Sequence, residues 1–287
     1  MDTDLNDGIA IVQNEPTYPV ARSAVEYERL RRQAAFLGGT TDRLFRAAGL
    51  EPGMRVLDVG CGAGDVALLA ARLVGSAGEV VGVDTDGAAL DVARARAHSL
   101  GLTNIRFIEG DARTAEPDGT FDAAVGRLVL MYCKDPADAV RRVAAHLRPG
   151  GIVAFQEFDL DPAIGSRSLP DDTLWNDIGR LLVDTFARAG THTRMGRQLF
   201  TAFIDAGLPA PEMRDETLIG GGPGFGGYGW LAGVARGLSP LMTKLGLVDT
   251  DQLDVDTLAD RLRDDAVRNR AVVWTPALVG AYARKDQ

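Results

Sequence analysis

The sequence predicts an α/β protein with a doubly wound, mostly parallel sheet of seven strands and a helical cap or lid. Three observations support this fold class. Short apolar segments of strand length recur through the middle of the chain, and helical segments separate them. Strands that are apolar on both faces are typical of a parallel sheet covered by helices on each side. A glycine-rich turn, GCGAG at 60–64, follows the first of these strands, where such sheets bind ligands.

Before the first strand, the sequence predicts an irregular start and two helices. Apolar residues at helical spacing predict one helix over 23–37, which Gly38 and Gly39 are expected to end. A second helix is expected over 42–50. We therefore expect residues 1–53 to form an N-terminal helical cap.

Residues 54–160 alternate strands and helices and are expected to form the ligand-binding core. Predicted strands lie at 55–59, 79–84, 104–111, 121–126 and 151–158, and predicted helices lie at 65–74, 86–100 and 135–147. Asp86 is expected to cap the second of these helices. Because crossovers between parallel strands are right-handed, the helices should cover both faces of the sheet.

The pattern changes in residues 161–287, which are expected to supply the remaining strands and a lid. Helices are predicted over 174–190 and 196–208, a strand over 211–220 and a last strand over 271–285. The helical stretch 230–269 between these strands is expected to be an insertion over the sheet edge or a lid.

Composition limits the partners. The chain has 31 Lys and Arg residues and 40 Asp and Glu residues, which gives a formal net charge of −9. This charge argues against a nucleic acid as partner, because a protein that binds nucleic acid needs a basic face. Two isolated cysteines, Cys61 and Cys133, suggest neither a disulfide framework nor a Cys-rich metal site and fit a reducing cytoplasm. The N-terminus is acidic, and no segment reaches the roughly 18 apolar residues of a membrane span. A small-molecule substrate in the cytoplasm is expected, with a homodimer as an open alternative for the assembly.

The glycine run raises a specific question, because Gly destabilises regular structure by roughly 0.5–1 kcal/mol relative to Ala. Gly60, Gly62 and Gly64 lie just past the first strand, at the carboxyl edge of the sheet. Without Cβ atoms they allow a tight turn and let a ligand lie against the backbone. A tight connection without a ligand is the alternative interpretation.

Acids after the next two strands favour a ligand. Asp84 follows the second strand, where a carboxylate accepts hydrogen bonds from both ribose hydroxyls. Asp111 follows the third strand, where it and the Ala112 amide suit adenine; a solvated loop acid is the alternative. Together the three loops describe an adenosine site.

The spacing then indicates which adenosine compound. A dinucleotide site would usually read G-x-G-x-x-G, whereas this loop reads G-x-G-x-G with Asp58 before it and Asp65 after it. Two carboxylates would repel a pyrophosphate but suit an ammonium or sulfonium group. The sequence therefore points to S-adenosylmethionine rather than NAD.

At this point the chain resembles the class I S-adenosylmethionine-dependent methyltransferases, of the bacterial small-molecule type. The resemblance covers about residues 54–158 and is carried by VLDVGCGAGD (56–65), VVGVD (80–84), IEGDA (108–112), FDAAVGRLVLMY (121–132) and LRPGG (147–151). It implies a Rossmann-like fold and a set of cofactor-binding residues: Asp58, Gly60, Cys61, Gly62, Gly64, Asp84, Thr85, Asp111, Ala112, Arg127 and Leu128, with Tyr18 and Gln33 from the cap.

Methyl transfer from a sulfonium mainly requires alignment of a nucleophile, which supplies on the order of 7–11 kcal/mol at best. An oxygen nucleophile would gain from a base, for which Glu157 and His192 are the candidate catalytic residues. The alternatives are a cap or loop acid at Glu157 and an exposed or capping histidine at His192. No metal is expected.

Aromatic residues of the cap are candidates to line a substrate pocket, namely Trp175, Tyr228 and Trp230, together with Phe186 and Phe225. Packing between lid and sheet is the alternative for each. As a group they favour a small, largely apolar substrate methylated at oxygen, nitrogen or carbon. Two other functions stay open: a methyltransferase-like protein that binds the cofactor without transfer, and a nicotinamide-dependent oxidoreductase.

Overall fold

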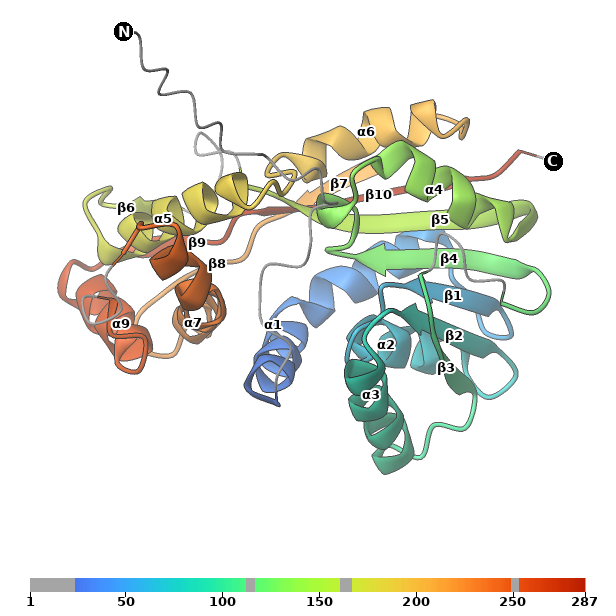
Figure 1. Ribbon diagram of the computed structural model, residues 1–287, viewed down its shortest axis with the longest axis horizontal. Coiled ribbons are helices and arrows are strands. Elements are labelled where there is room, and N and C mark those ends of the chain that lie inside the picture. Colours follow the sequence, from blue (N-terminus) through green and yellow to red (C-terminus); the bar gives the residue numbers. More distant parts are fainter. Residues whose placement is uncertain (1–23, 112–116, 161–166, 249–252, 287) are drawn as a thin grey trace, which may run out of the picture.

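The computed structural model describes residues 24–111, 117–160, 167–248 and 253–286, and its centre is a seven-stranded sheet in the order β3-β2-β1-β4-β5-β10-β7 (Figure 1). The strands are β1 (Arg55–Val59), β2 (Glu79–Asp84), β3 (Ile105–Glu109), β4 (Phe121–Arg127), β5 (Leu147–Asp159), β7 (Glu212–Glu216) and β10 (Ala277–Arg284). β10 runs antiparallel to both its neighbours, and the pairs from β3 to β5 are all parallel. The predicted fold class is confirmed.

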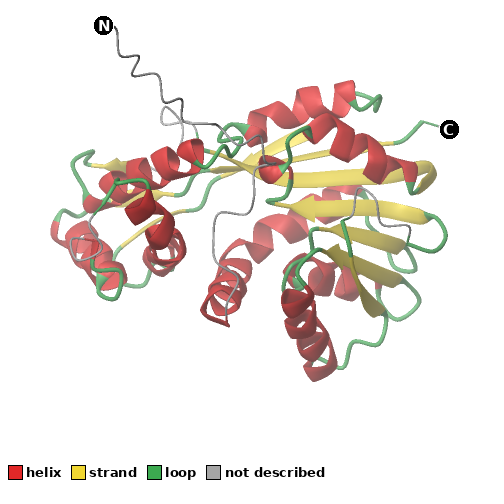
Figure 2. Cartoon of the chain, viewed as in Figure 1, coloured by secondary structure: helices red, strands yellow, loops and turns green. Residues whose placement is uncertain are grey.

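Helices cover both faces of this sheet (Figure 2). Alternate residues of β1 show the division: Val56 packs in one apolar core with α1 and α2, and Leu57 packs in a second core with α4 and α6. The helices of the core are α1 (Ala24–Ala48), α2 (Asp65–Val74), α3 (Gly87–Ser99), α4 (Pro136–Ala145) and α6 (Met195–Asp205). Asp86 caps α3 as predicted, with its side chain accepting hydrogen bonds from the Ala88 and Ala89 amides.

The predicted break at Gly38 and Gly39 is wrong, because α1 runs through both glycines as one helix. Each glycine inside a helix costs about 1 kcal/mol relative to Ala. The helix beyond them buries Leu44 and Phe45 against the sheet, and fully buried side chains of this size contribute about 1.5–3 kcal/mol each. Packing of the second half of α1 therefore outweighs the local preference to stop.

The two strands predicted near the C-terminus are each divided. Residues 211–220 form β7 and β8 (Ile219–Gly221), and residues 271–285 form β9 (Val272–Trp274) and β10. β8 and β9 leave the main sheet and join β6 (Arg167–Leu169) in a three-stranded antiparallel sheet. The chain crosses between sheets at Thr275, whose side-chain oxygen accepts a hydrogen bond from the Leu218 amide at 3.1 Å.

The small sheet belongs to a lid lobe, which we define as β6, β8 and β9 with α5 (Leu174–Arg188), α7 (Gly227–Lys244) and α9 (Leu258–Arg268). These helices pack on one another, and α7 also contacts α1. The lobe lies beside the carboxyl edge of the parallel strands, at the left of Figure 1. Among the helices that the structure describes, none combines the length and apolar composition that a membrane crossing needs.

Candidate functional site

A cavity of about 540 Å³ lies at the carboxyl edge of the sheet, between α1, the strand ends and the lid lobe. We divide its wall into two parts. The cofactor arm consists of the loops after β1, β2 and β3, with the first turns of α1. The acceptor arm consists of apolar residues from α4, α5 and α7, from the end of β5 with Leu160 after it, and of Pro276 between β9 and β10. Residues 127–133, at the end of β4 and beyond it, line the cavity between these two arms.

The glycine loop of the cofactor arm explains why bare backbone is needed there. Gly60, Gly62 and Gly64 all have positive φ angles, of 64°, 50° and 83°. A Cβ on Gly60 would lie 2.7 Å from a Val129 methyl carbon, and one on Gly64 would lie 2.9 Å from the Ala93 Cβ. A Cβ on Gly62 would meet no described atom within 4 Å, and Gly62 lines the cavity. Two glycines therefore permit close packing, and the third leaves room beside the cavity.

Asp84 and Asp111, at the ends of the neighbouring strands, both line the cavity, as does Thr85. The Asp84 carboxylate accepts hydrogen bonds from the Gly62 amide at 2.8 Å and the Asp86 amide at 2.9 Å. A carboxylate offers about four lone-pair sites, so two remain for ligand hydroxyls. Asp84 thus ties the glycine loop to β2 while it faces the cavity. Ala112, predicted beside Asp111, lies outside the described residues.

Two groups of opposite charge type lie near the carboxyl edge of the sheet, and they differ in exposure: Asp58 of β1 does not line the cavity, whereas the half-buried Arg127 at the end of β4 does. Asp58 is buried, neither of its carboxyl oxygens has a partner in hydrogen-bonding geometry among the described residues, and burial raises its pKa well above the usual range. Burial lowers the pKa of Arg127, which lines the cavity. Arg127 donates to the Thr41 hydroxyl at 2.9 Å, and Thr41 donates to the Gln156 side chain at 2.8 Å. No described carboxylate lies within ion-pair distance of Arg127.

This charge pattern fits the amino-acid end of S-adenosylmethionine. Buried charges are usually paired or hydrogen-bonded, and Asp58 and Arg127 are not paired with each other. Asp65, which lines the cavity, is already paired with Arg96 at 2.7 Å. An ammonium group near Asp58 and a carboxylate beside Arg127 would give each of these two side chains a partner of opposite charge.

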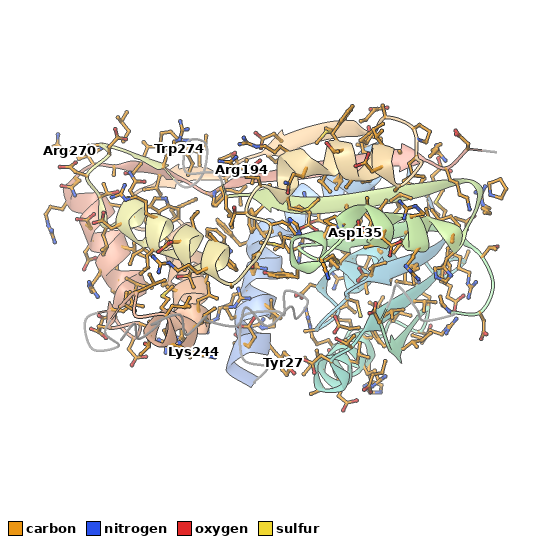
Figure 3. The ribbon with its side chains drawn as sticks, turned by 45° about the horizontal axis from the view of Figure 1, so that its top comes forward. Tyr27, Asp135, Arg194, Lys244, Arg270 and Trp274 are labelled. Atoms are coloured by element: carbon orange, nitrogen blue, oxygen red, sulfur yellow. The ribbon has the colours of Figure 1, made fainter. Side chains whose placement is uncertain are left out.

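The first turns of α1 complete the cofactor arm. Arg29 donates two hydrogen bonds to the Glu26 carboxylate, each at 2.7 Å, and a third to the Gln33 carbonyl oxygen at 3.0 Å. The Trp230 indole of α7 reaches the same Gln33 oxygen at 3.4 Å, so α1 and the lid lobe share one polar network. Tyr27, which Figure 3 labels, donates to the Asp86 carboxylate at the start of α3 at 3.0 Å.

Sequence reasoning found Gln33 and missed Glu26, Tyr27 and Arg29, all of which line the cavity. The available signal was the spacing of Glu26, Arg29 and Gln33, since positions i, i+3 and i+7 of a helix share one face. Tyr18, the other residue predicted from the cap, lies outside the described residues.

The acceptor arm is almost entirely apolar. Its described wall consists of Ala139, Val143, Phe158, Leu160, Gly179, Leu182, Val183, Phe186, Trp230, Leu231, Val234 and Pro276. Of the aromatic residues predicted to line a substrate pocket, the structure brings Trp230 and Phe186 to the cavity.

Trp175, Tyr228 and Phe225 do not line this cavity. They pack on one another inside the lid lobe, with ring centroids 5.6–6.4 Å apart. The Trp175 indole donates to the carbonyl oxygen of Trp274, which Figure 3 labels in the same lobe. These three residues therefore hold the lobe together, which is the packing alternative.

Neither predicted catalytic residue lines the cavity. Glu157 is fully buried, and its carboxylate accepts hydrogen bonds from the backbone amides of Val129, Leu130 and Met131. Burial raises the pKa of Glu157 to about 7, and these hydrogen bonds oppose the rise. His192 lies in the loop between α5 and α6, where its ring Nε2 is 2.9 Å from the Cys133 carbonyl oxygen. Both side chains contact backbone rather than the cavity.

Comparison with known proteins finds similar sequences and similar folds. A family model described as "Methyltransferase domain" matches residues 50–185. The ubiquinone/menaquinone biosynthesis C-methyltransferase UbiE of Pseudomonas fluorescens is 36% identical over 129 residues, which cover 42% of this chain and 50% of that protein. The chain spans about half the length of the curated relatives it matches.

Two solved structures show the same fold over most of the chain. YcgJ of Bacillus subtilis has a TM-score of 0.55 at 19% identity and covers 87% of this chain and 99% of its own. The [4+2]-cyclase SpnF has a TM-score of 0.51 at 23% identity and covers 86% of this chain and 80% of its own.

Proposed function

We propose that the chain is a class I S-adenosylmethionine-dependent methyltransferase that methylates a small, largely apolar metabolite at oxygen, nitrogen or carbon, since its residues 50–185 match a methyltransferase domain and it is similar to a curated C-methyltransferase. The observation that carries the proposal is one cavity with two chemistries. Its cofactor arm presents bare backbone at Gly60 and Gly62 and the carboxylates of Asp84 and Asp111, which supports binding of an adenosine with an amino-acid head. Its acceptor arm presents an apolar wall that belongs to the lid lobe and α4.

The chain's own residues would act by binding, orienting and excluding water. S-adenosylmethionine, when bound, supplies an electrophilic methyl group on a sulfonium sulfur. Asp58, Asp84, Asp111 and Arg127 would fix that molecule against the glycine loop. The apolar walls from α5 and α7 would exclude water and hold the acceptor in line, and alignment of this kind contributes on the order of 7–11 kcal/mol at best.

The acceptor arm also bears on the type of nucleophile. Its described residues include no carboxylate and no imidazole. This favours an acceptor atom that is nucleophilic without a protein base, such as an electron-rich carbon or a readily ionised hydroxyl. The similarity to UbiE, a C-methyltransferase of quinone biosynthesis, supports carbon as one candidate atom.

The test is incubation of the purified protein with methyl-labelled S-adenosylmethionine and a panel of small apolar phenols, quinols and amines. We expect label in at least one acceptor together with stoichiometric S-adenosylhomocysteine. Tight binding of S-adenosylhomocysteine with no transfer to any acceptor would instead favour a member of this fold that does not methylate, since SpnF shows the same fold and is named as a cyclase. Binding of NADH in place of S-adenosylhomocysteine would contradict the cofactor assignment.

A further inference from the structure

Residues 128–133, between β4 and α4, form a segment that we call the acceptor loop, and every one of its residues lines the cavity. The loop begins with Leu128, whose φ of 57° places a branched side chain in the left-handed region. Such a conformation persists only where the surroundings enforce it. Two segments that are distant in the sequence make the contacts that hold the acceptor loop in place.

The first segment is the end of β5, beneath the loop. The Leu128 amide donates to the Gln156 carbonyl oxygen at 2.9 Å. The Glu157 carboxylate then accepts from the next three amides, those of Val129 and Leu130 at 2.9 and 2.8 Å and that of Met131 at 3.4 Å. These amides precede or begin the short 3₁₀ helix Leu130–Tyr132, whose first N–H groups have no partner within the helix. One buried carboxylate therefore fixes the entry of the loop.

The second segment is the loop between α5 and α6. The His192 amide donates to the Met131 carbonyl oxygen at 2.9 Å, and the His192 ring is 2.9 Å from the Cys133 carbonyl oxygen. Because a carbonyl oxygen only accepts, the ring Nε2 carries the proton in this contact. His192 therefore fixes the exit of the loop.

We propose that Glu157 and His192 are positioning residues that clamp the acceptor loop from opposite ends and so set where an apolar acceptor lies relative to the methyl group. The inference rests on the proposed function for the identity of the two ligands. It assigns a role to two side chains that the cavity does not touch. It also predicts that the two residues act on acceptor binding more than on cofactor binding, because the glycine loop, Asp84 and Asp111 make no hydrogen bond with either.

The test uses conservative variants of the full-length chain. Glu157→Gln keeps the side-chain size but leaves one accepting oxygen for three amides. His192→Phe removes the ring donor, and His192→Gln restores an N–H donor of similar reach. Glu51→Gln and His98→Phe, at exposed positions away from the loop, serve as matched controls. Circular dichroism checks that each variant folds. If the variant at the buried Glu157 does not fold, the two variants at the half-exposed His192 still test the proposal.

Two measurements need no turnover. Hydrogen exchange of the 129–131 amides, in protein saturated with S-adenosylhomocysteine, should be at least tenfold faster in Glu157→Gln than in wild type or controls. Calorimetric titration with 1-naphthol, a small apolar phenol, should show about tenfold weaker binding in Glu157→Gln and His192→Phe, with His192→Gln within threefold of wild type. The affinity for S-adenosylhomocysteine should change less than threefold in every variant.

Unchanged amide exchange and unchanged 1-naphthol affinity in the folded variants would overturn the proposal. A parallel loss of 1-naphthol and S-adenosylhomocysteine binding would also overturn it, since that pattern indicates general loosening of the fold. For an acceptor that is methylated, the same variants should raise its KM more than they lower kcat. Absence of methyl transfer by the wild type would contradict the proposed function alone, because neither the exchange nor the titration depends on it.

Discussion

The cofactor arm takes its wall mainly from the loops that follow three consecutive strands, together with α1. The acceptor arm takes its wall mainly from α4, β5, α5 and α7, which are spread over about a hundred residues of sequence. The first arm is rich in charge and backbone donors. The second is apolar and lacks carboxylates and imidazoles among its described residues. One cavity thus joins a binding surface fixed by local turns to one fixed by long-range packing, and the acceptor loop connects them.

The largest expected effect is the pH dependence that Glu157 gives to the free energy of unfolding. It tests whether this carboxyl group is buried beneath the acceptor loop, which connects the two arms. Its pKa rises from 4.5 unfolded to about 7 folded, so the folded state binds more protons between these values. The free energy of unfolding should therefore fall as pH rises from about 4.5 through 7, by on the order of 3 kcal/mol from this group. Urea unfolding of wild type and Glu157→Gln at pH 5 and pH 8 measures it. An equal pH dependence in both proteins would show that Glu157 ionises normally.

Removal of the Asp84 carboxylate should weaken cofactor binding and leave the acceptor arm unchanged. Asp84→Ala should weaken binding of S-adenosylhomocysteine by about 1–3 kcal/mol, with the upper end expected because the Gly62 and Asp86 amides also lose their acceptor. Isothermal calorimetry measures the change, with the exposed Asp91→Ala on α3 as control. An affinity equal to wild type would mean that Asp84 is not the ribose ligand.

Replacement of Arg127 should weaken binding of ligands that carry the amino-acid end of the cofactor and spare ligands that lack it. Arg127→Met should weaken binding of S-adenosylhomocysteine by about 2 kcal/mol, a typical value for a hydrogen bond to a charged group. Binding of 5′-methylthioadenosine, which lacks the amino-acid head, should stay within twofold of wild type. Equal losses for both ligands would place Arg127 at the nucleoside or in the fold instead.

The smallest effect is expected from a bulkier side chain in the acceptor arm. It should impair use of the acceptor and leave cofactor binding unchanged, the opposite of the two preceding variants. Val234→Phe on α7 should lower kcat/KM for the acceptor about tenfold, because overpacking costs about 1–3 kcal/mol, and should leave S-adenosylhomocysteine affinity unchanged. Val267→Phe, at an exposed position on α9, is the matched control. If both ligands lost affinity equally, the division of the cavity into two arms would be incorrect.

The sequence by itself determined the parallel core and most of the cofactor arm. The strands, the left-handed turn at Gly60 to Gly64 and the acids at strand ends are local features, and the carboxyl ends of parallel strands necessarily meet at one edge. Asp84 and Asp111 could be placed at the site for that reason.

Only the tertiary structure decided the rest. α1 continues through Gly38 and Gly39 because its second half packs on the sheet, and Trp175 and Tyr228 pack within the lid lobe although Trp230 beside them reaches the cavity. The end of a strand does not reveal whether a carboxylate such as Glu157 faces a ligand or a neighbouring backbone. The orientation of that carboxylate depends on how segments far apart in the chain pack together. A local pattern of residues does not determine such packing.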